Sequence, residues 1–178
     1  VLIVDDTPEN LLVLSATLKQ NYTLLTASSG GEALALAAQA PHPDLILLDV
    51  CMPDMDGYQV CDQLKKTPGC ANIPIVFVTG LSSAEEERIG LAAGAVDYIT
   101  KPFHAELVMA RVNNHIELKR HRDNLEQEVE RRTRQLVEAR LTHSLLENDL
   151  RLALKLQLSL LPPARPLVNA RIERPRAF

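Results

Sequence analysis

Residues 45–57, LILLDVCMPDMDG, determine the fold of this chain of 178 residues. The segment opens with an unbroken apolar run, reaches Asp49, and continues with residues rich in Asp, Pro and Gly. A strand that is apolar on both faces is typical of a parallel sheet covered on both sides. The Pro and Gly residues predict a loop at the carboxyl end of that strand. Asp49 is therefore expected at the edge of a buried sheet.

Four other short apolar runs flank this segment and alternate with helical patterns, which predicts strands over residues 2–4, 22–27, 73–78 and 96–99. Thr7 followed by Pro8 predicts a helix start with a capping side chain. Ser82 and Ser83 each precede a Glu by three residues, so a further helix is expected from there to Gly94. Five strands alternating with helices predict a doubly wound α/β fold with a five-stranded parallel sheet.

Polar residues follow four of the five predicted strands: Asp5 and Asp6, then Asp49, Thr79 and Lys101. In doubly wound sheets, ligands bind outside the carboxyl ends of the strands, so these side chains should converge. Carboxylates about 4 Å apart repel by about 4 kcal/mol at an effective dielectric of 20, which a cation can relieve. Oxygen ligands favour Mg²⁺. A carboxylate beside Mg²⁺, a hydroxyl and an amine is suited to forming an aspartyl phosphate.

Four blocks of sequence together resemble the receiver domains of two-component response regulators: LIVDD (residues 2–6), LILLDVCMPDMDG, IVFVTG (75–80) and DYITKPF (97–103). The resemblance covers residues 1–118 and implies a flavodoxin-like sheet with strand order 2-1-3-4-5. It implies that Asp49 is the phosphoacceptor, that Thr79 hydrogen-bonds the phosphoryl group, and that Lys101 pairs with it. The implied Mg²⁺ site consists of Asp5, Asp6, Asp49 and the backbone carbonyl of Cys51.

The same resemblance places Tyr98 at an aromatic switch position and implies a cis peptide bond at Lys101–Pro102. If Thr79 moves toward a phosphoryl group, Tyr98 can fill the space that Thr79 leaves, which repacks the face of the fourth helix, fifth strand and fifth helix. A half-buried strand aromatic is the alternative interpretation of Tyr98. The implied phosphoryl donor is a sensor histidine kinase or a phosphotransfer protein.

Other acids, histidines and cysteines of the chain are interpreted as structural residues and not as functional ones. Asp54 and Asp56 are interpreted as turn residues of a Pro/Gly loop. Four histidines are interpreted as solvated helix residues, with no partner set that suggests a phosphotransfer histidine or a metal ligand: His104, His115, His121 and His143. Three cysteines without C-x-x-C spacing are interpreted as reduced thiols with neither a disulfide nor a zinc site: Cys51, Cys61 and Cys70.

The net charge of −4 conceals a division: residues 1–102 carry −8 and residues 103–178 carry +4. This division suggests two architectures. The basic residues lack interleaved aromatics, which disfavours nucleic-acid binding. No run approaches the roughly 18 apolar residues of a membrane span, and no signal segment opens the chain, so a cytoplasmic protein without membrane contact is expected. Because Val1 already lies within an apolar run, we expect the first strand to be cut short.

Residues 103–161 contain neither Gly nor Pro, which predicts one long helix. A heptad frame fits it, and residues 119–161 are interpreted as a coiled coil of a parallel homodimer, with a lone solvated helix as the alternative. One seam position takes Leu118, Leu125, Arg132, Ala139, Leu146, Ala153 and Leu160. The other takes Arg122, Val129, Leu136, His143, Leu150 and Gln157.

The stretch LRLALKLQLSLLPPARP at residues 150–166 is similar to the segment that opens the metal-dependent serine/threonine phosphatase domains regulating sigma-factor antagonists in bacteria. It suggests that residues 162–178 are a loosely ordered tail that begins an output domain. Two other functions are also considered. One is an aspartyl-phosphate phosphotransfer enzyme on a similar sheet, which would turn over a small phosphoester. The other is a coiled-coil adaptor with a passive receiver-like dock, which would not bind Mg²⁺ with a phosphate mimic.

Overall fold

The computed structural model describes residues 1–80, 88, 90 and 92–160. The chain divides into two compact units, Val1–Glu126 and Gln127–Phe178. The helix start predicted at Ser82 and Ser83 lies outside the described residues. Within the described part, no helix combines the length and the apolar composition needed to cross a membrane.

The first unit is built on a five-stranded parallel sheet in the order β2-β1-β3-β4-β5, which confirms the predicted flavodoxin-like fold. The register aligns Val4 with Leu48 and Thr79 with Thr100, so the carboxyl ends of the strands form one edge. The strands are β1 (Leu2–Val4), β2 (Leu25–Ala27), β3 (Ile46–Asp49), β4 (Ile75–Thr79) and β5 (Asp97–Thr100).

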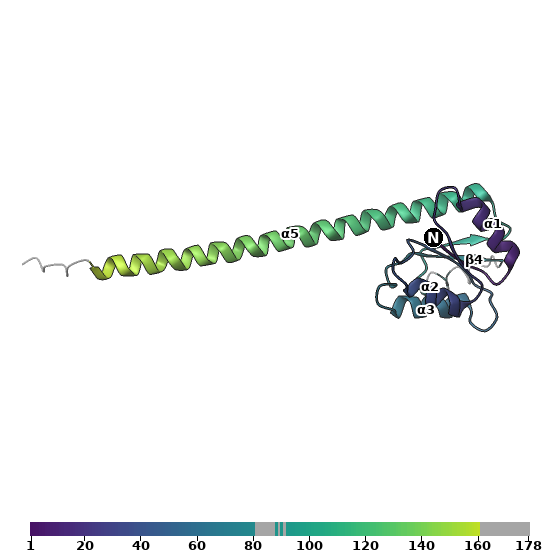
Figure 1. Cartoon of the computed structure of the whole chain (residues 1–178), viewed down its shortest axis with the longest axis horizontal. Helices are drawn as coiled ribbons and strands as arrows, with labels where there is room; N and C mark the ends of the chain where they lie inside the picture. The colour runs from purple at the N-terminus through teal and green to yellow at the C-terminus, as the bar shows by residue number, and fades with distance from the viewer. Residues whose placement is uncertain (81–87, 89, 91, 161–178) are drawn as a thin grey trace, which may run out of the picture. The chain divides into compact units, whose positions relative to one another are not determined.

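Helices cover both faces of this sheet (Figure 1). Successive strand side chains point to opposite faces, so Ile46 and Leu48 enter one core cluster while Leu47 enters the other. The first cluster is closed by α2 (Gly30–Ala38) and α3 (Gly57–Lys66), and the second by α1 (Pro8–Leu18) and the start of α5 (Ala105–Leu160). The residues of each unbroken apolar run are therefore buried alternately in the two core clusters.

The second strand is shorter than predicted. The backbone N–H of Tyr22 donates to the carbonyl of Leu18, so Tyr22 completes the turn after α1 and the strand begins only at Leu25. The side-chain hydroxyl of Tyr22 donates to Asn113 Oδ1 on α5. This long-range bond gave no local signal in the sequence.

The helix starts partly follow the predicted chemistry. Thr7 is the N-cap of α1 and Pro8 follows it, but the Thr7 side chain makes no capping hydrogen bond, so that expectation was wrong. Asp56 caps α3 by accepting from the backbone N–H of Gln59 at 2.8 Å. Asp54 has φ 66°, a turn conformation that Asp tolerates better than most residues. The two loop acids therefore shape the approach to α3.

The part of α5 in the second unit exposes almost all its side chains. From Gln127 to Gln157 only Glu128 is half-buried. Large aliphatic side chains are among those exposed: Val129, Leu136, Val137, Leu141, Leu145, Leu146, Leu150, Leu152, Leu154 and Leu156. A single helix with this composition leaves much of its apolar surface in water.

Candidate metal centre at the carboxyl edge of the sheet

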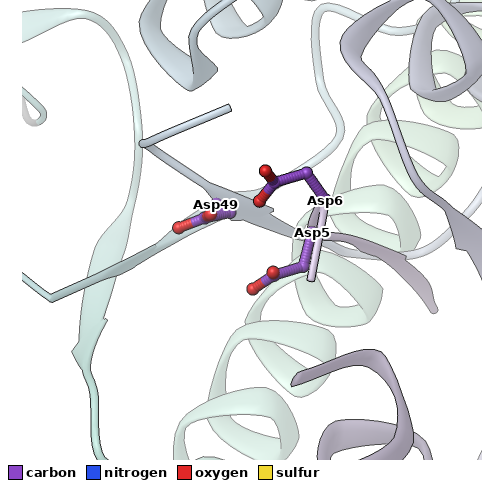
Figure 2. A group of neighbouring side chains, drawn as sticks. All are labelled: Asp5, Asp6 and Asp49. Carbon is purple, nitrogen blue, oxygen red and sulfur yellow. The ribbon is translucent and has the colours of Figure 1, made fainter. Parts of the chain in front are cut away.

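Three carboxylates meet at the carboxyl edge of the sheet, as the sequence predicted. Asp5 and Asp6 follow β1 and Asp49 ends β3, and one oxygen of each lies within 4.8 Å of the others. Figure 2 shows the three side chains reaching into a shared space. The parallel register of β1 and β3 explains this approach, because Val4 pairs with Leu48 and the next residue in the chain after each of them is an aspartate. Asp5 and Asp49 are buried, whereas Asp6 is exposed.

Lys101, which follows β5, reaches across β4 to this cluster. Its Nζ lies 2.8 Å from Asp5 Oδ2 and 3.1 Å from Asp49 Oδ1. The Lys101 backbone N–H donates to the carbonyl of Thr79 at 2.8 Å, and the Lys101–Pro102 peptide bond is cis. The ammonium group therefore bridges two of the three carboxylates.

Burial and hydrogen bonding shift the pKa values of Asp49 and Lys101 in opposite directions. Burial raises the pKa of Asp49 above its ordinary value, although the hydrogen bond from Lys101 acts in the opposite direction. Burial alone would lower the pKa of Lys101, but its hydrogen bonds to Asp5 and Asp49 outweigh that effect and raise the pKa. A buried carboxylate with a raised pKa gains when a cation is near. A further cation at this edge would therefore stabilise the charged form of Asp49.

The loop after β3 is held tightly against Asp49. The backbone N–H of Gly57 donates to the Val50 carbonyl at 3.0 Å, and a Cβ on Gly57 would lie only 2.3 Å from the Asp49 carbonyl oxygen. A side chain there would push the acidic residue out of place. Cys51 lies exposed in the same loop. Gly57 is a site residue that sequence reasoning missed, although its place beside Asp56 in a Pro/Gly loop was a usable signal.

The remaining residues predicted for the site lie on β4 and β5. Thr79 ends β4 and is 8% exposed. Tyr98 is half-buried on β5 and packs against the cluster of α2 and α3. The guanidinium carbon of Arg111, on α5, lies 5.7 Å from the centre of the Tyr98 ring. Tyr98 thus lies within β5, whereas the other predicted residues end or follow β1, β3, β4 and β5.

His115 is not the solvated helix residue expected from the sequence. Its Nε2 lies 2.9 Å from Asp97 Oδ2, and both side chains are 17% exposed. Arg111 pairs with the other carboxylate oxygen of Asp97. Burial would raise the pKa of Asp97, but the hydrogen bonds from His115 and Arg111 outweigh it and hold the pKa below its usual value. Because β5 and α5 supply the partners, no helical spacing revealed them.

The donor set of the cluster fits a hard divalent cation. Three carboxylates offer only oxygen atoms, the ligands that Mg²⁺ takes, and Mg²⁺ usually binds through one or two carboxylates together with waters and phosphate oxygens. The chain also supplies the Lys101 ammonium group beside the acids, and Thr79 ends β4, the strand next to β3. Such an arrangement can stabilise a phosphoryl group on a carboxylate oxygen.

Comparison with known proteins agrees with this arrangement. The response regulator receiver domain family matches residues 1–113. A probable cyclic di-GMP phosphodiesterase of Vibrio cholerae is 46% identical over 125 residues, covering 70% of this chain and 28% of that protein. The response regulator PleD of Caulobacter vibrioides is 44% identical over 115 residues, covering 64% of this chain and 25% of that protein. The chain thus spans about a quarter of the length of these two relatives.

A solved structure shares the fold and part of the sequence. The BeF₃-activated receiver domain of DrrB, a Thermotoga maritima protein, superposes with a TM-score of 0.59 at 34% identity. The match covers 65% of this chain and 95% of that one. The family match covers more than half of the chain and includes every strand that forms the acidic edge. The chain therefore belongs to the response regulator receiver domain family.

Proposed function

We propose that residues 1–118 form a receiver domain that accepts a phosphoryl group on Asp49. The observation that carries this proposal is the bridge from Lys101 to Asp5 and Asp49, at 2.8 and 3.1 Å, within a cluster of three carboxylates. A lysine in this position compensates part of the negative charge and can pair with phosphoryl oxygens. Family membership supports the same assignment.

The chemistry follows from the nucleophile. A carboxylate oxygen of Asp49 attacks phosphorus, and the bond from phosphorus to the donor's leaving atom breaks with its electron pair going to the leaving group. The proposed donor is the phosphohistidine of a sensor histidine kinase or a phosphotransfer protein. Lys101 pairs with the new phosphoryl oxygens and Thr79 donates a hydrogen bond to them. Mg²⁺ would be held by Asp5, Asp6, Asp49 and the backbone carbonyl of Cys51, and supplies charge neutralisation when bound.

The response is proposed to pass from Thr79 to Tyr98. Thr79 and Tyr98 lie on neighbouring strands, and the register pairs Thr79 with Thr100, two residues beyond Tyr98. Movement of Thr79 toward the phosphoryl group changes the space available to the Tyr98 ring. Arg111, which lies against that ring, carries the change onto α5. The helix predicted over residues 82–94 would complete this face, and most of it lies outside the described residues.

We also propose that residues 119–161 form the coiled coil of a parallel homodimer. The exposed seam residues support this: Leu125, Val129, Leu136, Leu146 and Leu150 are between 63% and 71% exposed on the single chain. Long helices are stabilised mainly by packing of an apolar face. A second copy of the helix offers the matching face for each of these residues.

The output domain is proposed to follow this helix, with residues 162–178 as its beginning. Residues 150–166 support a serine/threonine phosphatase domain. The Vibrio cholerae relative, named as a probable cyclic di-GMP phosphodiesterase, supports a different output. Assays of the full-length protein with a phosphorylated protein substrate and with cyclic di-GMP distinguish these two outputs.

Phosphoryl uptake tests the central assignment. The wild-type chain is incubated with Mg²⁺ and acetyl phosphate, and intact-protein mass spectrometry follows the addition of one phosphoryl group. Asp49→Asn is expected to abolish the adduct. Asp54→Asn, a change of the same kind at a loop acid with φ 66°, is the matched control and should keep wild-type uptake. An adduct that persists in Asp49→Asn contradicts the proposal.

Two further measurements address the other functions considered from the sequence. Sustained hydrolysis of a small phosphoester such as p-nitrophenyl phosphate would favour a phosphotransfer enzyme. Failure to bind beryllofluoride with Mg²⁺ would favour a passive dock. The BeF₃-activated DrrB structure supports the choice of beryllofluoride as the probe.

A further inference from the structure

Asp5 is the most completely enclosed carboxylate of the metal centre. It is 0% exposed, and each of its oxygens has a partner. Oδ1 accepts from the backbone N–H of Thr7 and from the side-chain amide of Asn10, both at 2.9 Å, while Oδ2 accepts from Lys101 at 2.8 Å. Asp6, in contrast, is exposed, and its side chain accepts a hydrogen bond of 3.4 Å from the Thr7 hydroxyl.

The two donors to Asp5 Oδ1 come from different parts of the chain: one is a backbone N–H and the other a side-chain amide. The Thr7 N–H belongs to the backbone at the start of α1, two residues from Asp5. The Asn10 amide is a side-chain group in the first turn of that helix, and Asn10 is half-buried. The last torsion of an Asp side chain has a broad energy profile. The Asn10 amide therefore gives Oδ1 a second donor, and it restricts the rotation of the carboxylate further than the Thr7 N–H and Lys101 do without it.

The orientation of this plane matters for the whole cluster. With Oδ1 held by Thr7 and Asn10, Oδ2 faces Lys101, which in turn lies 3.1 Å from Asp49. Asn10 thus sets the position of a charge that both the ammonium group and a bound cation must meet. Groups that orient a metal site's carboxylates typically change metal affinity by 10-fold or more when they are removed.

We propose that Asn10 is a positioning residue of the metal centre, and that its amide orients Asp5 for a hard divalent cation of the Mg²⁺ type. This inference rests on the proposed function, because it takes Asp5, Asp6 and Asp49 as the residues that hold the cation. Asn10 itself does not touch the cation. It acts through Asp5 Oδ1, so its loss removes no carboxylate from the cluster but changes how the Asp5 carboxylate is oriented.

The test compares Asn10→Leu, which removes the amide but keeps much of the volume, with the wild-type chain. Isothermal titration of metal-free protein with MgCl₂ is expected to give a Kd about 10-fold higher for Asn10→Leu. In acetyl phosphate uptake, the Mg²⁺ concentration at half-maximal rate should rise by a similar factor. The rate at saturating Mg²⁺ should return close to the wild-type value.

Thr17→Val is the matched control. It removes a side-chain hydrogen bond of 2.9 Å, from Thr17 to the Val13 carbonyl, elsewhere on α1, and should leave the Mg²⁺ affinity unchanged. If Asn10→Leu does not unfold cooperatively in a metal-free thermal melt, Asn10→Ala is used for the same titrations.

Two results overturn the inference alone: a folded Asn10 variant with a Kd for Mg²⁺ within twofold of wild type, or a lower maximal rate with an unchanged half-saturating Mg²⁺ concentration. The second is the signature of a merely structural role. A wild-type chain that neither binds Mg²⁺ nor takes up phosphate overturns the proposed function together with the inference. A raised Kd in Asn10→Leu, with Thr17→Val unchanged, supports it.

Discussion

The two units of the chain use the same aliphatic residues in opposite ways. Leu47, on β3 in the first unit, is 0% exposed, whereas Leu136, on α5 in the second unit, is 71% exposed. The first unit completes its two cores within one chain and gathers three carboxylates at one edge of the sheet. The second unit carries a periodic apolar pattern without covering it. A hydrophobic period therefore tells which face will be buried, but not whether the same chain supplies the cover.

The largest expected effect tests this difference in stability. Leu47→Ala should lower the free energy of unfolding of the first unit by about 2–5 kcal/mol, because it leaves a cavity between β3 and the helices on that face. Urea denaturation followed by circular dichroism, with the protein at a fixed concentration, measures the loss. Leu136→Ala removes the same atoms from the second unit.

At protein concentrations where the chain is monomeric, Leu136→Ala should leave the unfolding transition of the first unit unchanged. Equal losses for the two variants would contradict the contrast between a self-sufficient core and an uncovered helix. The comparison also fails if Leu47→Ala leaves the transition unmoved.

A second prediction concerns what covers the helix. Leu150→Glu, on the proposed seam, should raise the dissociation constant of the homodimer on the order of 100-fold. Two buried leucines are lost per dimer, about 3 kcal/mol in total. Sedimentation equilibrium over a range of concentrations measures this constant.

Leu141→Glu is the matched control, because Leu141 is 61% exposed, close to the 63% of Leu150, but lies outside the heptad seam. It should change the constant much less. If both substitutions weaken the dimer equally, the seam is placed wrongly. A wild-type chain that is monomeric at every concentration would contradict the proposed homodimer.

The fold was predictable because its signals are local. Unbroken apolar runs such as residues 45–48, each followed by a loop or helix start, specify buried parallel strands, and five of them allow few arrangements. The acidic edge was predictable for the same reason, since parallel strands bring their carboxyl ends together. Asp5 directly follows β1, and Asp49 ends the neighbouring strand β3. The strand boundaries were harder to predict. At β2, the backbone N–H of Tyr22 bonds to the carbonyl of Leu18 at the end of α1, so Tyr22 does not join the strand.

The contacts that the sequence did not reveal join elements far apart in the chain or depend on side-chain direction. Asn10 lies only five residues from Asp5, yet nothing in the spacing says that its amide turns back toward that carboxylate. His115 meets Asp97 across α5 and β5. These pairings depend on how the helices pack on the sheet. A residue pattern predicts which face of a helix packs there, but not which side chains meet.

The smallest predicted effect uses that second pairing. Asp97→Asn should lower the free energy of unfolding at pH 7 by about 1 kcal/mol, because it weakens charge-assisted hydrogen bonds from Arg111 and His115 at a partly exposed position. The folded-state pKa of Asp97 is below its ordinary value of 3.8, so the unfolded chain binds the proton more readily. The stabilisation is thus complete above pH 3.8 and is lost as the pH falls through the folded pKa.

Urea denaturation at pH 7 and at a series of pH values below 4 should therefore show the difference between wild type and Asp97→Asn shrinking with acid. A difference that is constant over this range would mean that the carboxylate is not held charged by its partners. Glu128→Gln is the control in the second unit, where Glu128 accepts from Arg131 and Arg132 at 2.8 and 2.7 Å. Those partners lie three and four residues away on one exposed helix, so the ion pairs need only helical structure and are screened by solvent. Glu128→Gln should leave the unfolding of the first unit unmoved, because only Asp97 joins two elements that the folding of this unit brings together.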